Sequence, residues 1–129
     1  EGYVDGFMGA VHEWNRNRVR GDVQGALQSC VKLLRSALFE RDAFRTLLLK
    51  DENASLYLRF SQRAARMIAR YLTDTTAEEY ARYHKVEIHH LYETFYLLVF
   101  GLVGYLREHP DASDELIADL IADTLHLDV

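Results

Sequence analysis

Histidine and glutamate side chains crowd one short stretch of the chain, and these residue types bind metals and transfer protons. The stretch contains His84, Glu87, His89, His90 and Glu93. On a helix, Glu87 and His90 have the spacing of di-iron bundle ligands, but such a site needs two Glu-x-x-His motifs and two further inward glutamates. Only one such motif is present. The pattern favours surface pairs such as His89–Glu93, worth a few tenths of a kcal/mol, and predicts no metal. A metal-binding helical-bundle enzyme that uses this cluster is the alternative.

His84 differs from the other histidines because it shares a predicted helical face with Ile88, Leu91 and Phe95. A polar group among such neighbours must be hydrogen-bonded, or its burial costs about 1–3 kcal/mol. His84 is therefore either a satisfied core histidine or the polar anchor of an otherwise apolar ligand pocket. With the aromatic residues of other helices it defines a predicted ligand site, formed by Trp14, Tyr57, Phe60, Met67, His84, Ile88 and Phe95.

Enzyme motifs are missing from the sequence. It has no nucleophile elbow, no glycine-rich phosphate loop and no Cys/His pairing, so we expect neither an enzyme nor a cofactor. Cys30 lies on the apolar stripe of its helix and is predicted to be a small core residue. As the only cysteine, it excludes an internal disulfide and a Cys-rich zinc site.

The composition predicts one all-α domain of about five to six helices. Hydrophobic residues make up 49% of the 129 residues and charged residues 27%, with a single proline. The net charge of −5 argues weakly against binding nucleic acid phosphates. The longest apolar run, Phe95 to Leu106, has about twelve residues, whereas a bilayer span needs roughly 20. No signal peptide is visible, so we expect a cytoplasmic protein that does not enter membranes.

Hydrophobic residues recur at helical spacing in six stretches. Asp22, Asn53 and Ser113 are predicted N-caps, Thr76 and Glu79 match a capping box, and Pro110 ends a helix. The predicted helices span about 3–18, 23–40, 42–49, 54–72, 77–108 and 114–125.

The predicted 77–108 helix has a second apolar face. Gly101 and Gly104 each cost about 1 kcal/mol relative to alanine, and close approach of another backbone would explain them. We expect this face and the last helix to form a four-helix interface between two copies. The predicted interface residues are Leu97, Phe100, Gly101, Gly104, Ile117, Leu120, Ile121 and Thr124. The last helix folding back within one chain, or a generic helical interaction module, are the alternatives.

Four segments together resemble the C-terminal regulatory domain of TetR/AcrR-family transcriptional regulators: GDVQGALQSCVKLLRSALFERDAFRTLLLKDEN, SLYLRFSQRAARMIARYL, FYLLVFGLVGYLREHP and DASDELIADLIADTL. The resemblance covers roughly Gly21 to Leu125. It implies that residues 21–129 bind a small, largely apolar effector in a helical core and form a homodimer through the last two helices.

The same resemblance implies that residues 1–20 are the tail of a connecting helix. DNA would be contacted by an N-terminal helix-turn-helix, and residues 1–20 are too few for its three helices. We therefore expect operator binding to require a helix-turn-helix that this chain lacks.

Overall fold

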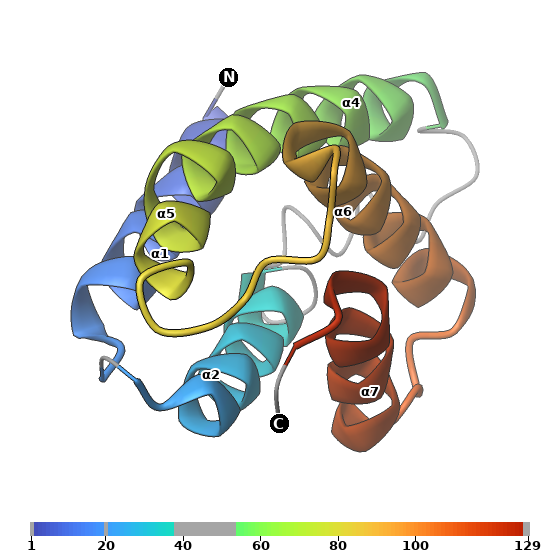
Figure 1. The fold of residues 1–129 in the computed structure, drawn as a ribbon. Helices are drawn as coiled ribbons and strands as arrows, with labels where there is room; N and C mark the ends of the chain where they lie inside the picture. Colours follow the sequence, from blue (N-terminus) through green and yellow to red (C-terminus); the bar gives the residue numbers. More distant parts are fainter. Residues whose placement is uncertain (1, 20, 38–53, 128–129) are drawn as a thin grey trace.

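The computed structural model describes residues 2–19, 21–37 and 54–127, and these ranges contain helices but no strand. The predicted all-α fold is confirmed. A π-helical turn, η3 (Leu72–Thr76), joins α4 to α5. The α-helices are α1 (Gly2–Asn17), α2 (Val23–Arg35), α4 (Ala54–Tyr71), α5 (Ala77–Tyr80), α6 (Leu91–Glu108) and α7 (Asp114–Leu125). Figure 1 shows them arranged as a ring, with α1 and α5 on one side and α6 and α7 on the other.

Local capping fixes several helix ends where the sequence predicts them. The Asp22 carboxylate accepts the Gly25 N–H at 3.0 Å and starts α2. Ser113 Oγ accepts the Leu116 N–H at 3.1 Å and starts α7. Helix α6 ends at Glu108, just before Pro110. The predicted helix 42–49 and the predicted cap Asn53 lie outside the described residues.

The predicted continuous helix 77–108 is wrong. Helix α5 ends at Tyr80, α6 begins at Leu91, and residues 81–90, called the strap below, form turns and an extended segment. The N–H groups of Tyr83 and His84 both donate to the Tyr80 carbonyl, which closes the end of α5. From residue 84 to 89 the side chains are alternately half-buried and exposed. This period of two suits an extended chain, and Val86 and Ile88 are β-branched residues that favour it.

The predicted capping box of Thr76 and Glu79 is also wrong. Thr76 has helical dihedrals (φ −64°, ψ −44°), and its hydroxyl donates to Asn15 Oδ1 at 2.8 Å. The preceding threonine hydroxyls donate to carbonyls four residues back, Thr73 to Ala69 at 2.7 Å and Thr75 to Tyr71 at 2.6 Å. Such side-chain bonds compete with the backbone hydrogen bonds of a helix and bend it. They account for the wide π-helical turn η3 at the position where the sequence predicts a break between two helices.

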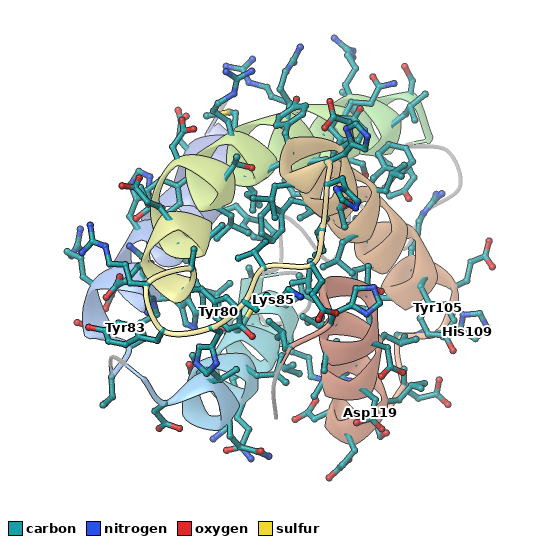
Figure 2. All side chains as sticks on the ribbon, viewed as in Figure 1. Tyr80, Tyr83, Lys85, Tyr105, His109 and Asp119 are labelled. Atoms are coloured by element: carbon teal, nitrogen blue, oxygen red, sulfur yellow. The ribbon has the colours of Figure 1, made fainter. Side chains whose placement is uncertain are left out.

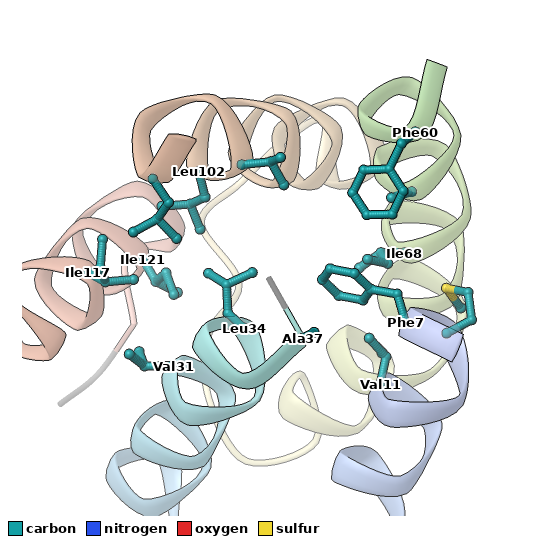
Figure 3. Close-up of a cluster of buried hydrophobic side chains, with 14 of the residues drawn as sticks. Phe7, Val11, Val31, Leu34, Ala37, Phe60, Ile68, Leu102, Ile117 and Ile121 are labelled. Carbon is teal, nitrogen blue, oxygen red and sulfur yellow. The ribbon is translucent and has the colours of Figure 1, made fainter. Parts of the chain in front are cut away.

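The main hydrophobic core joins α1, α2, α4, α6 and α7 (Figure 3), and a smaller cluster of Ala69, Ala77 and Phe95 packs α5 against α4 and α6. Helix α1 contributes buried Phe7, whose ring lies 6.1 Å from that of Phe60 in α4. Helix α1 therefore packs into the same core as α4. Ile117 and Ile121 of α7 are 1% and 5% exposed and face the centre of this core in Figure 3.

Arg35 at the end of α2 joins that helix to the connection between α6 and α7. Its guanidinium pairs with Asp114 and donates to the carbonyls of Pro110 and Ala112. This contact adds to the packing of α2 on α7 and closes one side of the helical ring. Within the described ranges, no helix combines the length and apolarity that crossing a bilayer requires.

Candidate functional site

An apolar cavity of about 220 Å³ lies between the helices. Every described helix contributes to its wall, as do η3 and the strap. Helices α6 and α7 supply an aliphatic wall formed by Leu98, Val99, Leu102, Ile121 and Leu125. Protein interiors contain few voids larger than a water molecule, so a space of this size is the strongest candidate for a binding site.

Polar and charged side chains also line the cavity, among them Arg18, Glu79, Tyr80, His84 and Lys85. They come from the end of α1, from α5 and from the strap, and α1 and α5 lie on one side of the helical ring in Figure 1. The cavity lining is predominantly apolar, and we call the side where these residues gather its polar end.

A mostly buried ion pair forms part of the polar end. The Arg18 guanidinium bonds Glu79 Oε2 at 2.5 Å, and the two side chains are only 11% and 18% exposed. Arg18 Nε also donates to Asn15 Oδ1 at 3.0 Å, the oxygen that accepts the Thr76 hydroxyl. Asn15 lies in α1 and Arg18 directly follows this helix, whereas Thr76 belongs to η3 and Glu79 to α5. The network therefore holds α5 against α1.

Two aromatic arrangements define the cavity wall near this end. The His84 ring stacks on the Tyr80 ring, with centroids 4.5 Å apart and planes 20° from parallel. Trp14 Nε1 donates to the Ala26 carbonyl and to Ser29 Oγ, each at 3.0 Å. With its polar atom satisfied by the protein, the Trp14 indole offers an apolar surface to the cavity.

Cys30 also lines the cavity. Burial in these apolar surroundings raises the pKa of its thiol from 9.0 to about 11. At neutral pH the group is a protonated thiol, which is a poor nucleophile and a poor metal ligand. Cys30 is half-buried and lines the cavity, so it does not pack in the hydrophobic core as the sequence predicts.

The structure brings together four of the seven residues of the predicted ligand site. Trp14, His84, Ile88 and Phe95 line the cavity.

The other three predicted residues lie elsewhere. Phe60 is 2% exposed and packs in the core beside Phe7. The Tyr57 ring lies 4.3 Å beneath the guanidinium carbon of Arg107, at the α4–α6 contact. Met67 is half-buried and packs on the core without lining the cavity. One helical stripe of α4 thus fills the core, and only Ile68 reaches the cavity.

Several cavity residues escaped the sequence prediction. Arg18 and Glu79 are oppositely charged residues 61 positions apart, and no local pattern pairs them. Lys85 and Val86 belong to the strap, whose alternation of polar and apolar residues was the available signal. Leu98 and Leu102 belong to an apolar stripe that the sequence predicts, but such a stripe does not indicate whether a cavity lies beside it.

The histidine and glutamate cluster does not form a metal site. Glu87 and His90 are exposed and lie in the strap. Because the strap is not helical, the two side chains do not share a helical face as the sequence suggests. In the part of the chain that the structure describes, no three His, Cys, Asp or Glu side chains lie close enough together to hold a metal ion.

The predicted dimer residues fall into two groups. Leu97 is 69% exposed, Gly101 and Thr124 are exposed, and a Cβ added at Gly101 would meet no atom within 4 Å. Leu120 is half-buried, as is Phe100, whose ring stacks on that of Tyr96.

The remaining three dimer residues are engaged within the chain. A Cβ at Gly104 would come within 3.1 Å of the Tyr57 hydroxyl, so this glycine accommodates α4. Ile117 and Ile121 are buried in the core.

In comparisons with known proteins, no family model, no curated protein and no solved structure matches the chain.

Proposed function

We propose that this chain is the effector-binding and dimerisation domain of a cytoplasmic transcriptional regulator of the TetR/AcrR kind, and that its effector is a small, largely apolar molecule held in the cavity. The observation that carries the proposal is the cavity of about 220 Å³ with its aliphatic wall. An apolar occupant would remove this apolar lining from water, which favours binding by about 25 cal/mol per Å² of apolar surface buried.

The strap supports the same proposal. Tyr83, His84, Val86 and Ile88 all line the cavity, although the strap contains no helix. In Figure 1 it crosses the front of the ring between α5 and α6. A short extended segment can move away from a cavity mouth without breaking helical hydrogen bonds, which gives a ligand a route inward.

Exposed apolar residues on α6 and α7 support dimerisation. Leu97, Gly101 and Tyr105 follow each other at four-residue steps along α6 and form what we call the α6 stripe. Leu116, Leu120 and Thr124 follow the same spacing along α7. A second copy packed on these helices would cover Leu97 and explain the exposed Gly101. DNA binding would then reside in a helix-turn-helix outside this chain, as the resemblance to TetR/AcrR regulators implies.

Trp14 provides the test of ligand binding, since it is the only tryptophan and lines the cavity. Titration with linear alcohols, alkylbenzenes and naphthalenes should give saturable changes in its fluorescence. Cys30→Phe, which adds a ring to the cavity wall, should weaken binding about tenfold or more, because overpacking a filled site costs about 1–3 kcal/mol. Gln28→Phe is the matched control, since Gln28 is exposed on the same helix.

Absence of saturable binding by every molecule in this panel would contradict the proposal. Equal weakening by Cys30→Phe and Gln28→Phe would show that the molecules bind somewhere other than the cavity.

A further inference from the structure

The charged groups around the cavity are unequally engaged by the protein. Among the residues that the structure describes, four formally charged ones line it: Arg18, Asp22, Glu79 and Lys85. Glu79 is bound by Arg18, and the Asp22 carboxylate accepts the N–H of Gly25. Lys85 forms no ion pair with any residue of the described ranges. Within the described ranges, the two lining carboxylates thus already have protein donors, and one lining cation is paired with no carboxylate.

Lys85 is placed to meet a ligand at the mouth of the cavity. It lies on the strap, is exposed, and is next to His84, which stacks on Tyr80 at the polar end. Figure 2 shows Lys85 on the strap, where the strap crosses in front of the ring of helices. An ammonium group at this position stays hydrated when the cavity is empty, so no buried charge destabilises the free protein.

We propose that the ligand is a small aliphatic carboxylate, with its tail against the aliphatic wall of α6 and α7 and its carboxylate at Lys85. This rests on the proposed function, namely that the cavity binds a small, largely apolar molecule. A carboxylate supplies the one charge that the polar end lacks, whereas a cationic head group would face Lys85 and a glutamate already bound by Arg18.

The volume sets the length of the tail. An apolar cavity of about 150 Å³ takes up benzene. On that scale the cavity of about 220 Å³ suits a chain of roughly eight to ten carbons. Its far end would reach the residues of α6 and α7 that contain no polar side-chain atom, including Leu102, Ile121 and Leu125.

Three eight-carbon molecules that differ only in the head group test the proposal: octanoate, 1-octanol and octylammonium. Binding to the full chain is measured by calorimetry and by Trp14 fluorescence. Octanoate should bind about three- to tenfold more tightly than 1-octanol, the range expected for a partly hydrated charge-assisted contact. Lys85→Met should remove this preference, so that octanoate no longer binds more tightly than 1-octanol. Lys32→Met is the matched control, because Lys32 is an exposed lysine on α2 that does not line the cavity.

The outcomes distinguish an error in the assigned head group from an error in the proposed binding cavity. If 1-octanol or octylammonium binds as tightly as octanoate, the carboxylate assignment is overturned and the cavity proposal stands. Equal loss in Lys85→Met and Lys32→Met would also overturn it, by showing a general charge effect. If none of the three molecules binds, both the ligand class and the proposed function fail.

Discussion

At the scale of single residues, Cys30 links the cavity to a dependence of stability on pH. Its thiol ionises near pH 9 in the unfolded chain and near pH 11 in the folded protein. Between these values the unfolded state binds fewer protons, so the free energy of unfolding falls as pH rises. The stabilisation is complete below pH 9 and is lost by about pH 11. Its size is on the order of 2 kcal/mol.

Urea unfolding at pH 8 and pH 10.5 measures this effect. We expect wild type to lose about 1–2 kcal/mol more than Cys30→Ala between the two pH values. Tyrosines and lysines titrate in both proteins, so the difference isolates the thiol. Parallel losses in the two proteins would contradict the apolar environment assigned to Cys30.

At the scale of elements, the short helix α5 depends on its contact with α1. A helix of four residues has little stability of its own, because nucleation is unfavourable. Glu79 supplies a tertiary anchor through Arg18, and Ala77 is buried. The strap begins directly after α5, so the position of the cavity mouth depends on the same anchor.

Two neighbouring glutamates test this anchor. Glu79→Gln should lower the free energy of unfolding by about 2–3 kcal/mol, because it leaves Arg18 mostly buried without its counter-charge. Glu78→Gln removes only an exposed pair with Arg82, whose atoms are 4.0 Å apart, and should cost a few tenths of a kcal/mol. Urea unfolding at one pH gives both values. Similar costs for the two substitutions would show that Glu79 is not an anchor.

The strap also shows why the sequence predicted parts of the fold correctly and parts wrongly. Caps such as Asp22 and Ser113 are local signals, since the side chain and the amide it accepts are three residues apart. His84 and Ile88 match a helical stripe and also a period of two. The helical interpretation therefore placed them correctly in the site although the segment is extended.

The other part of the site depends on tertiary packing. Phe60 and Ile68 lie on the same apolar side of α4, yet only Ile68 borders the hollow. Periodicity identifies which side of a helix is buried but not what lies opposite it. The pairing of Arg18 with Glu79 likewise follows only from the fold.

At the scale of the whole molecule, the α6 stripe determines the expected assembly. Gly101→Leu should raise the dimer dissociation constant about tenfold or more, since a bulky side chain would overpack a close helix contact. Gly9→Leu is the matched control, because Gly9 is also an exposed helical glycine with open space around its Cβ position. Analytical ultracentrifugation should give twice the 15.0 kDa chain mass for wild type and Gly9→Leu.

A monomeric wild type, or a Gly101→Leu variant that dimerises as well as Gly9→Leu, would contradict this interface. Gly104 is unsuitable for the test, because its Cβ position faces Tyr57 within the same chain. A substitution there would report on the α4–α6 contact.

The cavity wall draws on every described helix, and this has a thermodynamic consequence. No single segment contains the whole site, so a ligand binds the folded chain and finds no binding site in the unfolded chain. Binding is then linked to global unfolding: at a concentration of 100 times Kd, any occupant adds about 2.7 kcal/mol to the free energy of unfolding. For a domain of this size, that corresponds to a rise in Tm of roughly 8–15 °C. The melting temperature of the unlabelled protein is thus itself a measure of whether the cavity is filled.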